Sequence, residues 1–234
     1  MIKPDIILVW PRNSDYPLWR LFIRKERERF GKVLVVFMNP QSGDDYREFV
    51  KQAMAPDNIT FIESATAEEL GSNDWRHAAI YKALPLVTSD WIWFTEQDFF
   101  PKADFFNELN KLFMSYPIIG IKEGDRLHPC SLFIRKDLIG KTGKNFGIVK
   151  DTSDHFSIFT KQLYNLNERV AFIDKSLYMH MAGLTSNLSL IEKEEQPNYK
   201  RDDFYKYLKA SLIVPVPRHE KYKLLVENAL KRSF

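Results

Sequence analysis

The sequence predicts an α/β protein with a twisted, mostly parallel sheet that is flanked by helices. Two observations support this prediction: short apolar runs that stop abruptly, and intervening stretches with apolar residues at helical spacing. Their alternation is typical of parallel strands joined by crossover helices. The chain has 234 residues, of which 44% are hydrophobic and 14% aromatic, so it can bury one large core.

The first strand is predicted at residues 6–10, an apolar run that Pro11 ends. A helix is expected over residues 18–30, where apolar side chains recur at helical spacing, and Gly31 is expected to end it. Residues 33–37 form the second apolar run and predict the second strand. The order strand, helix, strand begins the alternation of a parallel sheet.

The same alternation continues to residue 121. Each further strand is a short apolar run, and each further helix is an intervening segment of helical pattern. These elements are a helix over 44–55, a strand over 59–62, a helix over 74–84, a strand over 91–94, a helix ending at Phe113 and a strand over 117–121. Two aromatic residues of the fourth strand, Trp91 and Trp93, are expected to lie in the core.

From residue 121 the pattern changes, and a smaller subregion is expected there. Its predicted elements are a strand over 132–134, a helix over 154–163, strands over 170–173 and 176–179, and a C-terminal helix from Lys221. No repeat and no low-complexity tract interrupts the chain. We therefore expect one continuous domain made of two halves, residues 1–120 and 121–234.

Composition excludes several classes of protein. Cys130 is the only cysteine, so an intrachain disulfide and a cysteine zinc site are impossible, and we expect a small packed side chain. No apolar stretch approaches the roughly 20 residues that span a bilayer. The first residues also lack the pattern of a signal peptide. These observations predict a cytoplasmic protein without a transmembrane segment.

The most informative motif is Glu96-Gln97-Asp98, which closely follows the apolar run 91–94. In an open α/β sheet, ligands bind where the parallel strands end. Two carboxylates there, with one residue between them, can both face a divalent cation and the phosphates that it carries. A buried strand followed by a solvated acidic turn is the alternative, and the spacing alone does not separate the two.

Four short segments together suggest a function. They are Pro11-Arg12-Asn13 after the first strand, residues 74–79 at a helix start with Asp74 and Arg76, Glu96-Gln97-Asp98 after the fourth strand, and His180 after a late strand. In order and spacing these segments resemble the GT-A glycosyltransferases, the family-2 type in particular. There they correspond to the loop for the nucleoside base, the helix start facing the diphosphate, the Asp-x-Asp motif and the histidine that completes the metal site.

The resemblance implies a GT-A-like, Rossmann-type fold whose residues 1–120 bind a nucleotide sugar and whose residues 121–234 bind the acceptor. It implies a metal-dependent hexosyltransferase that moves a sugar from a nucleoside-diphosphate donor to a hydroxyl of a glycan, a lipid carrier or DNA. The donor-binding residues would be Pro11, Arg12, Asn13, Asp74, Arg76 and Glu96. The metal, Mn²⁺ or Mg²⁺, would be held by Asp98 and His180, because carboxylates suit both ions and imidazole suits Mn²⁺.

Transfer with inversion of the anomeric carbon needs a base that takes the acceptor's proton. The resemblance implies an acid at a helix start in the acceptor half, which Asp151-Thr152-Ser153-Asp154 matches. Asp154 is the preferred base and Asp151 is the second choice. Either aspartate can instead be a helix N-cap, and Arg76 can instead be a helix-surface residue.

The sequence also departs from the family pattern. Glu96 replaces the first aspartate of Asp-x-Asp, Phe99 replaces a frequent third acid, and His77 replaces the usual asparagine. The Gln-x-x-Arg-Trp signature of processive synthases is absent, so that branch is not expected. Glu96 leaves open a sugar-binding relative without catalytic activity.

Two further functions remain as alternatives. Residues 1–120 carry a net charge of −3 and residues 121–234 one of +6, which a mildly basic solvated surface also explains. Several lysines near two aromatic residues suit a nucleic-acid groove, and hence glycosylation of a modified DNA base: Lys141, Lys144, Lys150 and Lys161, with Phe146 and Phe156. The other alternative is a nucleotidyltransferase, against which the loop 11–17 argues because it contains no glycine.

Overall fold

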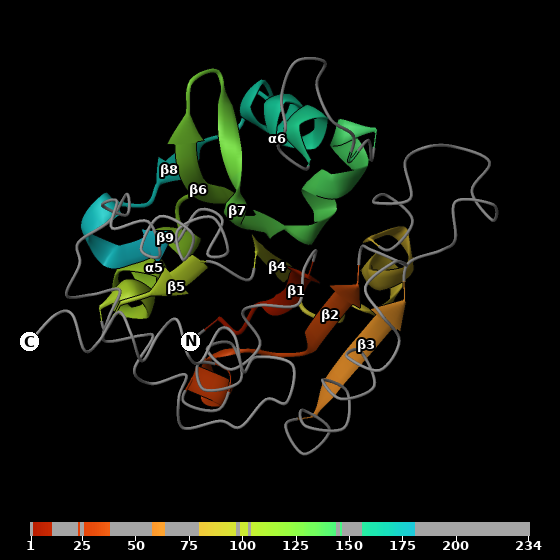
Figure 1. The fold of residues 1–234 in the computed structure, drawn as a ribbon. Helices are drawn as coiled ribbons and strands as arrows, with labels where there is room; N and C mark the ends of the chain where they lie inside the picture. The colour runs from red at the N-terminus through yellow and green to blue at the C-terminus, as the bar shows by residue number, and fades with distance from the viewer. Residues whose placement is uncertain are drawn as a thin grey trace, which may run out of the picture.

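The computed structural model describes residues 2–10, 23, 26–37, 58–63, 80–96, 99–102, 104–143, 146 and 156–180. The strands of the main sheet are β1 (Asp5–Trp10), β2 (Val33–Phe37), β3 (Ile59–Glu63), β4 (Trp91–Glu96), β6 (Ile118–Glu123), β7 (Arg126–Arg135) and β8 (Val170–Phe172). A second, two-stranded sheet consists of β5 (Phe99–Pro101) and β9 (Tyr178–His180). Figure 1 shows the β6–β7 hairpin and β8 on one side of β4, and β1, β2 and β3 on the other.

The main sheet has the strand order β3-β2-β1-β4-β7-β6-β8. Strands β3, β2, β1 and β4 are parallel to one another, and β6 is parallel to β8. Only β7 among these seven strands runs against its neighbours, β4 and β6. The predicted strands at 6–10, 33–37 and 91–94 therefore share one mostly parallel sheet, which confirms the predicted fold class.

The described helical segments are η1 (Arg27–Arg29), η3 (Leu84–Leu86), α5 (Phe105–Phe113), η4 (Lys136–Thr142), α6 (Ser157–Tyr164) and η5 (Lys175–Leu177). Residues 80–83 are helical and lead into η3, which confirms the end of the helix predicted over 74–84. The helices predicted over 44–55 and from Lys221 lie outside the described residues. Within the described part of the chain, no helix has both the length and the apolar character needed to cross a membrane.

Strand β4 lies at the centre of the core because both of its faces are covered. On one face, Trp93 is fully buried and stacks on Phe133 with ring centroids 4.9 Å apart, next to Phe105 of α5. On the other face, the Phe94 ring contacts Phe146 and Phe159, which places α6 over that side. The predicted core positions of Trp91 and Trp93 are thus confirmed.

The amino-terminal edge of the sheet is closed around Asp5, whose side chain is buried. Its carboxylate accepts hydrogen bonds from the backbone N–H groups of Lys32 and Thr88, both at 2.6 Å, and of Ser89 at 3.0 Å. Gly31 follows the helical turn, as predicted, but it does not have the positive φ of a left-handed cap. Glycine is needed there because a Cβ would collide with Asp5 Oδ1.

Candidate functional site

The carboxyl ends of β1 and β4 form the candidate site. From β1 the chain passes outward through β2 and β3, and it then returns to β4 on the other side of β1. The strand order therefore reverses between β1 and β4, and such a reversal is the switch point at which open α/β sheets bind ligands. The register pairs Val9 with Glu96, so the two strands end at nearly the same level.

The acidic motif lies at this edge. Glu96 is the last residue of β4 and is half-buried. By the alternation of a strand, its side chain lies on the face of Phe94, which α6 covers. Asp98 lies outside the described residues, but Glu96 precedes it by two residues and Phe99, the first residue of β5, follows it directly.

The two-stranded sheet of β5 and β9 places the backbone of His180 at the same edge of the main sheet as Glu96. Strands β5 and β9 are antiparallel, and their register pairs Phe99 with His180. The backbone of His180 therefore lies beside Phe99, the residue that follows Asp98, although Phe99 and His180 are 81 positions apart in the chain. A carboxylate and an imidazole on adjoining backbone segments are a donor set that fits Mn²⁺. Among the described residues, no group of three or more His, Cys, Asp or Glu side chains is placed to hold a metal ion.

Tyr178 of β9 stabilises the pairing of β5 with β9, a role that the sequence did not predict. Its ring stacks on Phe99 with centroids 5.1 Å apart. Burial raises the pKa of the Tyr178 hydroxyl to about 12, and the nearby Cys130 and Asp174 add to the effect. A tyrosine in a three-residue strand carries no signal in the sequence, because its role depends on the pairing of β5 with β9.

The candidate bases Asp151 and Asp154 lie outside the described residues. The prediction that the helix begins at Asp154 is wrong, because α6 begins at Ser157. Phe156 occupies the N-cap position with a left-handed φ of 61°. Its buried ring packs against Phe94, with the two ring centroids 6.1 Å apart. The chain therefore enters α6 on the face of the sheet that carries Glu96.

The other predicted donor-binding residues, Pro11, Arg12, Asn13, Asp74 and Arg76, also lie outside the described part of the chain. The structure does describe residues close to them in sequence, at the end of β1 and in the helix that precedes η3. Trp10, directly before Pro11, is the last residue of β1. Residues 80–83 belong to the helix whose start was predicted at Asp74. The loop after β1 therefore starts at the switch point.

The described part of the predicted nucleic-acid groove does not support it. In the nucleic-acid alternative Phe146 and Phe156 would stack on bases, but both side chains are buried in the core against Phe94. Lys141 forms an ion pair with Glu168, and Lys161 forms one with Asp125, each at 2.6 Å. Helical spacing alone cannot distinguish an aromatic residue that packs beneath a helix from one that faces a groove. Lys144 and Lys150 lie outside the described residues.

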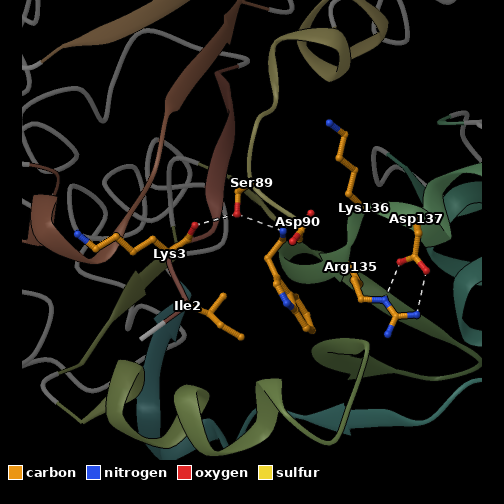
Figure 2. A pocket seen from close by; sticks show the side chains of 8 residues that line it. Ile2, Lys3, Ser89, Asp90, Arg135, Lys136 and Asp137 are labelled. Carbon is orange, nitrogen blue, oxygen red and sulfur yellow. Dashed lines mark hydrogen bonds and ion pairs between the residues drawn. The ribbon is translucent and has the colours of Figure 1, made fainter.

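A cavity of about 460 Å³ lies at the opposite edge of the sheet, where β1 and β4 begin and β7 ends. Figure 2 shows the paired side chains of Arg135 and Asp137 on its wall, while the ammonium groups of Lys3 and Lys136 point away from the other lining residues. Asp90 and Trp91 also line it. This cavity is separated from the carboxyl ends of β1 and β4 by the length of these strands and is not part of the candidate site.

No protein-family model and no curated protein matches the sequence. Several solved structures are similar in fold. Glucosyl-3-phosphoglycerate synthase from Mycobacterium tuberculosis, solved with Mn²⁺, UDP and phosphoglyceric acid, has a TM-score of 0.53 and 12% identity over 92% of this chain and 80% of its own. S. aureus TarS has a TM-score of 0.52 and 14% identity, over 90% of this chain and 39% of its own.

The galactosyltransferase LgtC, solved with donor and acceptor sugar analogues, has a lower TM-score of 0.45 and 12% identity, over 73% of each chain. At such identities the likeness concerns the fold. The synthase and TarS, together with the sheet order, show that this chain has the GT-A type of fold. The fold implied by the sequence resemblance is thereby confirmed.

Proposed function

We propose that this protein is a glycosyltransferase that moves a sugar from a nucleoside-diphosphate donor to a hydroxyl acceptor. The observation that carries the proposal is the switch point, where β1 and the acidic end of β4 stop at nearly the same level. The likeness to the mycobacterial synthase supports it, because that protein was solved with UDP and Mn²⁺. In this proposal residues 1–120 bind the donor, and residues 121–234 of the same continuous domain bind the acceptor.

The donor would lie across the carboxyl ends of β1 and β4. Pro11, Arg12 and Asn13 follow β1 and would receive the nucleoside base. Asp74 and Arg76 would face the diphosphate from their helix start. The planar guanidinium of Arg76 suits a phosphate because it can donate two parallel hydrogen bonds. Glu96 would bind the ribose, since its side chain leaves β4 at this edge.

Asp98 and His180 would hold a divalent cation, Mn²⁺ or Mg²⁺. The pairing of Phe99 with His180 supports this assignment, because it joins the two segments that carry these side chains. When bound, such a cation supplies positive charge that stabilises the diphosphate as it leaves. Asp98 and His180 would in turn fix the position of the diphosphate relative to Arg76.

Asp154 would act as the base of an inverting transfer of a hexosyl group, with Asp151 as the second choice. The carboxylate of Asp154 takes the proton of the acceptor hydroxyl as that oxygen bonds to the anomeric carbon. The bond from the anomeric carbon to the diphosphate breaks at the same time, and the nucleoside diphosphate leaves with the electron pair. The packing of Phe156 on Phe94 supports this role, because Asp154 stands two residues before Phe156.

For the acceptor, we favour a glycan or a lipid carrier over DNA. The described lysines of the expected groove are engaged in ion pairs, and its described aromatic residues are buried. A cytoplasmic location stays a prediction from the sequence. No described feature favours a nucleotidyltransferase.

A donor screen tests the proposed function. The purified protein, with Mn²⁺, is incubated with UDP-, GDP-, CMP- and dTDP-sugars, and the release of free nucleotide by slow hydrolysis is measured. We expect hydrolysis of one donor class that stops when the metal is chelated. If no donor is hydrolysed and none of the four nucleotides binds, the proposed function is wrong.

A further inference from the structure

His128 lies on the part of β7 that extends beyond the end of β4. β7 pairs with β4 over residues 131–135, and Glu96 ends β4 at the level of Cys130, so residues 126–129 continue past the carboxyl end of β4. On its other side, β7 pairs with β6, and the register jumps from Leu132 to His128 between Gly120 and Ile121. Residues 129–131 therefore form a bulge, which redirects the strand at the edge that carries the candidate site.

The imidazole ring of His128 binds this bulge. The Cys130 N–H donates a hydrogen bond to His128 Nδ1 at 3.0 Å, and the Cys130 carbonyl accepts one from the Thr95 hydroxyl at 2.9 Å. Cys130 and Thr95 are both buried. Side chains thus satisfy both backbone polar groups of a buried residue, and His128 is linked through Cys130 to the residue before Glu96.

The hydrogen bond also defines the tautomer of the ring. Nδ1 accepts a hydrogen bond from the Cys130 N–H, so a neutral His128 carries its own hydrogen on Nε2. Nε2 lies 3.9 Å from Glu123 Oε1, and Glu123 also pairs with Arg126 Nη2 at 2.6 Å. The side chain of His128 is 18% exposed, so neighbouring groups cover most of the ring.

The tip of the hairpin is tied down as well. Asp125, in the turn between β6 and β7, forms an ion pair with Lys161 of α6 at 2.6 Å. This pair lowers the pKa of the Asp125 carboxyl, chiefly through its hydrogen bond with the ammonium group. The hairpin is therefore held at its tip by α6 and at its bulge by the end of β4 (Figure 1).

We propose that His128 is a positioning residue of the donor site. By accepting the Cys130 N–H, it fixes the bulge against Thr95, and it thereby sets the position of the next residue, Glu96, at the end of β4. This inference rests on the proposed function, because it assigns to His128 the placement of Glu96, which binds the donor in that proposal.

Two substitutions of similar size separate this role from general packing. In His128→Asn, the side-chain oxygen can accept the N–H two residues later, as asparagine does in an Asx-turn. In His128→Gln, the amide lies one methylene further out and does not reach that N–H. Thr95→Val is a third variant, which keeps the shape of the side chain but removes the hydrogen bond to the Cys130 carbonyl.

Three measurements are made on the full chain: the ring tautomer of His128 by ¹⁵N NMR, the exchange rate of the Cys130 amide, and the affinity for UDP and GDP with Mn²⁺. We expect hydrogen on Nε2 in the wild type and exchange about tenfold faster in His128→Gln, because a buried N–H loses its acceptor. Nucleotide affinity should fall about tenfold in His128→Gln and Thr95→Val, and His128→Asn should restore most of it.

The outcomes distinguish failure of the proposed function from failure of the positioning role of His128. If the wild type binds neither nucleotide and the donor screen finds no other, the proposed function is wrong and the positioning role is rejected with it. If the screen finds another nucleotide, that nucleotide replaces UDP and GDP in this titration. If the wild type binds and His128→Gln, checked for its thermal transition, binds equally well, only the inference about His128 is wrong. A ring with its hydrogen on Nδ1, or Cys130 exchange that is equal in all variants, would also overturn it. If His128→Gln does not fold, Thr95→Val decides by its affinity alone.

Discussion

Asp5 joins the start of β1 to two turns through its single carboxylate. It receives N–H groups from Lys32 on one side and from Thr88 and Ser89 on the other. The sequence shows only an acid before an apolar run, and no pattern in it predicts that three backbone N–H groups donate to this carboxylate. Burial of the charge is tolerated because each carboxylate oxygen accepts at least one hydrogen bond.

Replacing Asp5 with Asn should destabilise the fold. The amide keeps the shape, but its NH₂ group would face backbone donors and leave at least one of them without an acceptor. We expect the free energy of unfolding to fall by about 2–4 kcal/mol, measured by urea denaturation. Asp90→Asn, an exposed aspartate at the same edge, is the control and should cost less than about 0.5 kcal/mol. Equal stability of the two variants would contradict the role of Asp5.

Tyr178 predicts a dependence of stability on alkaline pH. Its pKa in the folded protein is about 12, above the ordinary value of 10.0. The unfolded chain therefore releases this proton first, and the stabilisation present below pH 10.0 is lost as the pH rises toward about 12. The difference in unfolding free energy between the wild type and Tyr178→Phe should shift in favour of the variant over this range. A difference that stays constant with pH would show that Tyr178 titrates normally.

Asp154→Asn tests the assignment of the base. The amide cannot accept the acceptor's proton, so transfer should fall about 100-fold or more while donor affinity stays unchanged. Both are measured once the donor screen has given a donor and an acceptor has been found. Asp137→Asn, an exposed aspartate in the same half of the chain but at the opposite edge of the sheet, is the matched control and should transfer at the wild-type rate. Full transfer by Asp154→Asn would remove this residue from the mechanism and make Asp151 the next to test.

At the scale of elements, the sequence predicted what is local and missed what depends on a partner. Strands β1, β2, β3 and β4 are apolar runs bounded by breakers, and all were predicted within two residues of their ends. The strand predicted over 132–134 is instead the ten-residue β7, because its first half is no continuous apolar run and is stabilised by pairing with β6. The pairing of β5 with β9 was not predicted, since strands of three residues carry no periodic signal.

Helix α6 predicts a further change in stability. Phe159 is buried and packs on Phe146 with centroids 4.5 Å apart, and it also contacts Phe94 of β4. Phe159→Ala should lower the free energy of unfolding by about 3–5 kcal/mol, because it leaves a cavity between helix and sheet. Lys161→Ala, on the exposed side of the same helix, should cost about 1 kcal/mol or less. Thermal or urea unfolding of both variants makes the comparison, and similar losses would contradict this packing.

At the scale of the whole molecule, the order of the strands determines where a ligand can bind. The sequence predicted parallel strands but not that β4 lies next to β1, and this adjacency is what creates the switch point. The site residues were proposed from short motifs, and the structure adds backbone register at two of them, Val9 with Glu96 and Phe99 with His180. The roles of Arg76, Asp98 and Asp154 stay predictions, because these residues lie outside the described part of the chain.

The central claim is that a nucleoside diphosphate and its metal bind at the carboxyl end of β4. Calorimetric titration with UDP and GDP, with and without Mn²⁺, tests it most directly on the wild type, Asp98→Ala and Asp90→Ala. Asp90 is the control because it is an aspartate at the opposite edge of the sheet.

We predict binding of one nucleotide that requires Mn²⁺, is weakened about tenfold or more in Asp98→Ala, and is unchanged in Asp90→Ala. Wild-type affinity in Asp98→Ala, or no binding of either nucleotide to the wild type, would contradict the claim.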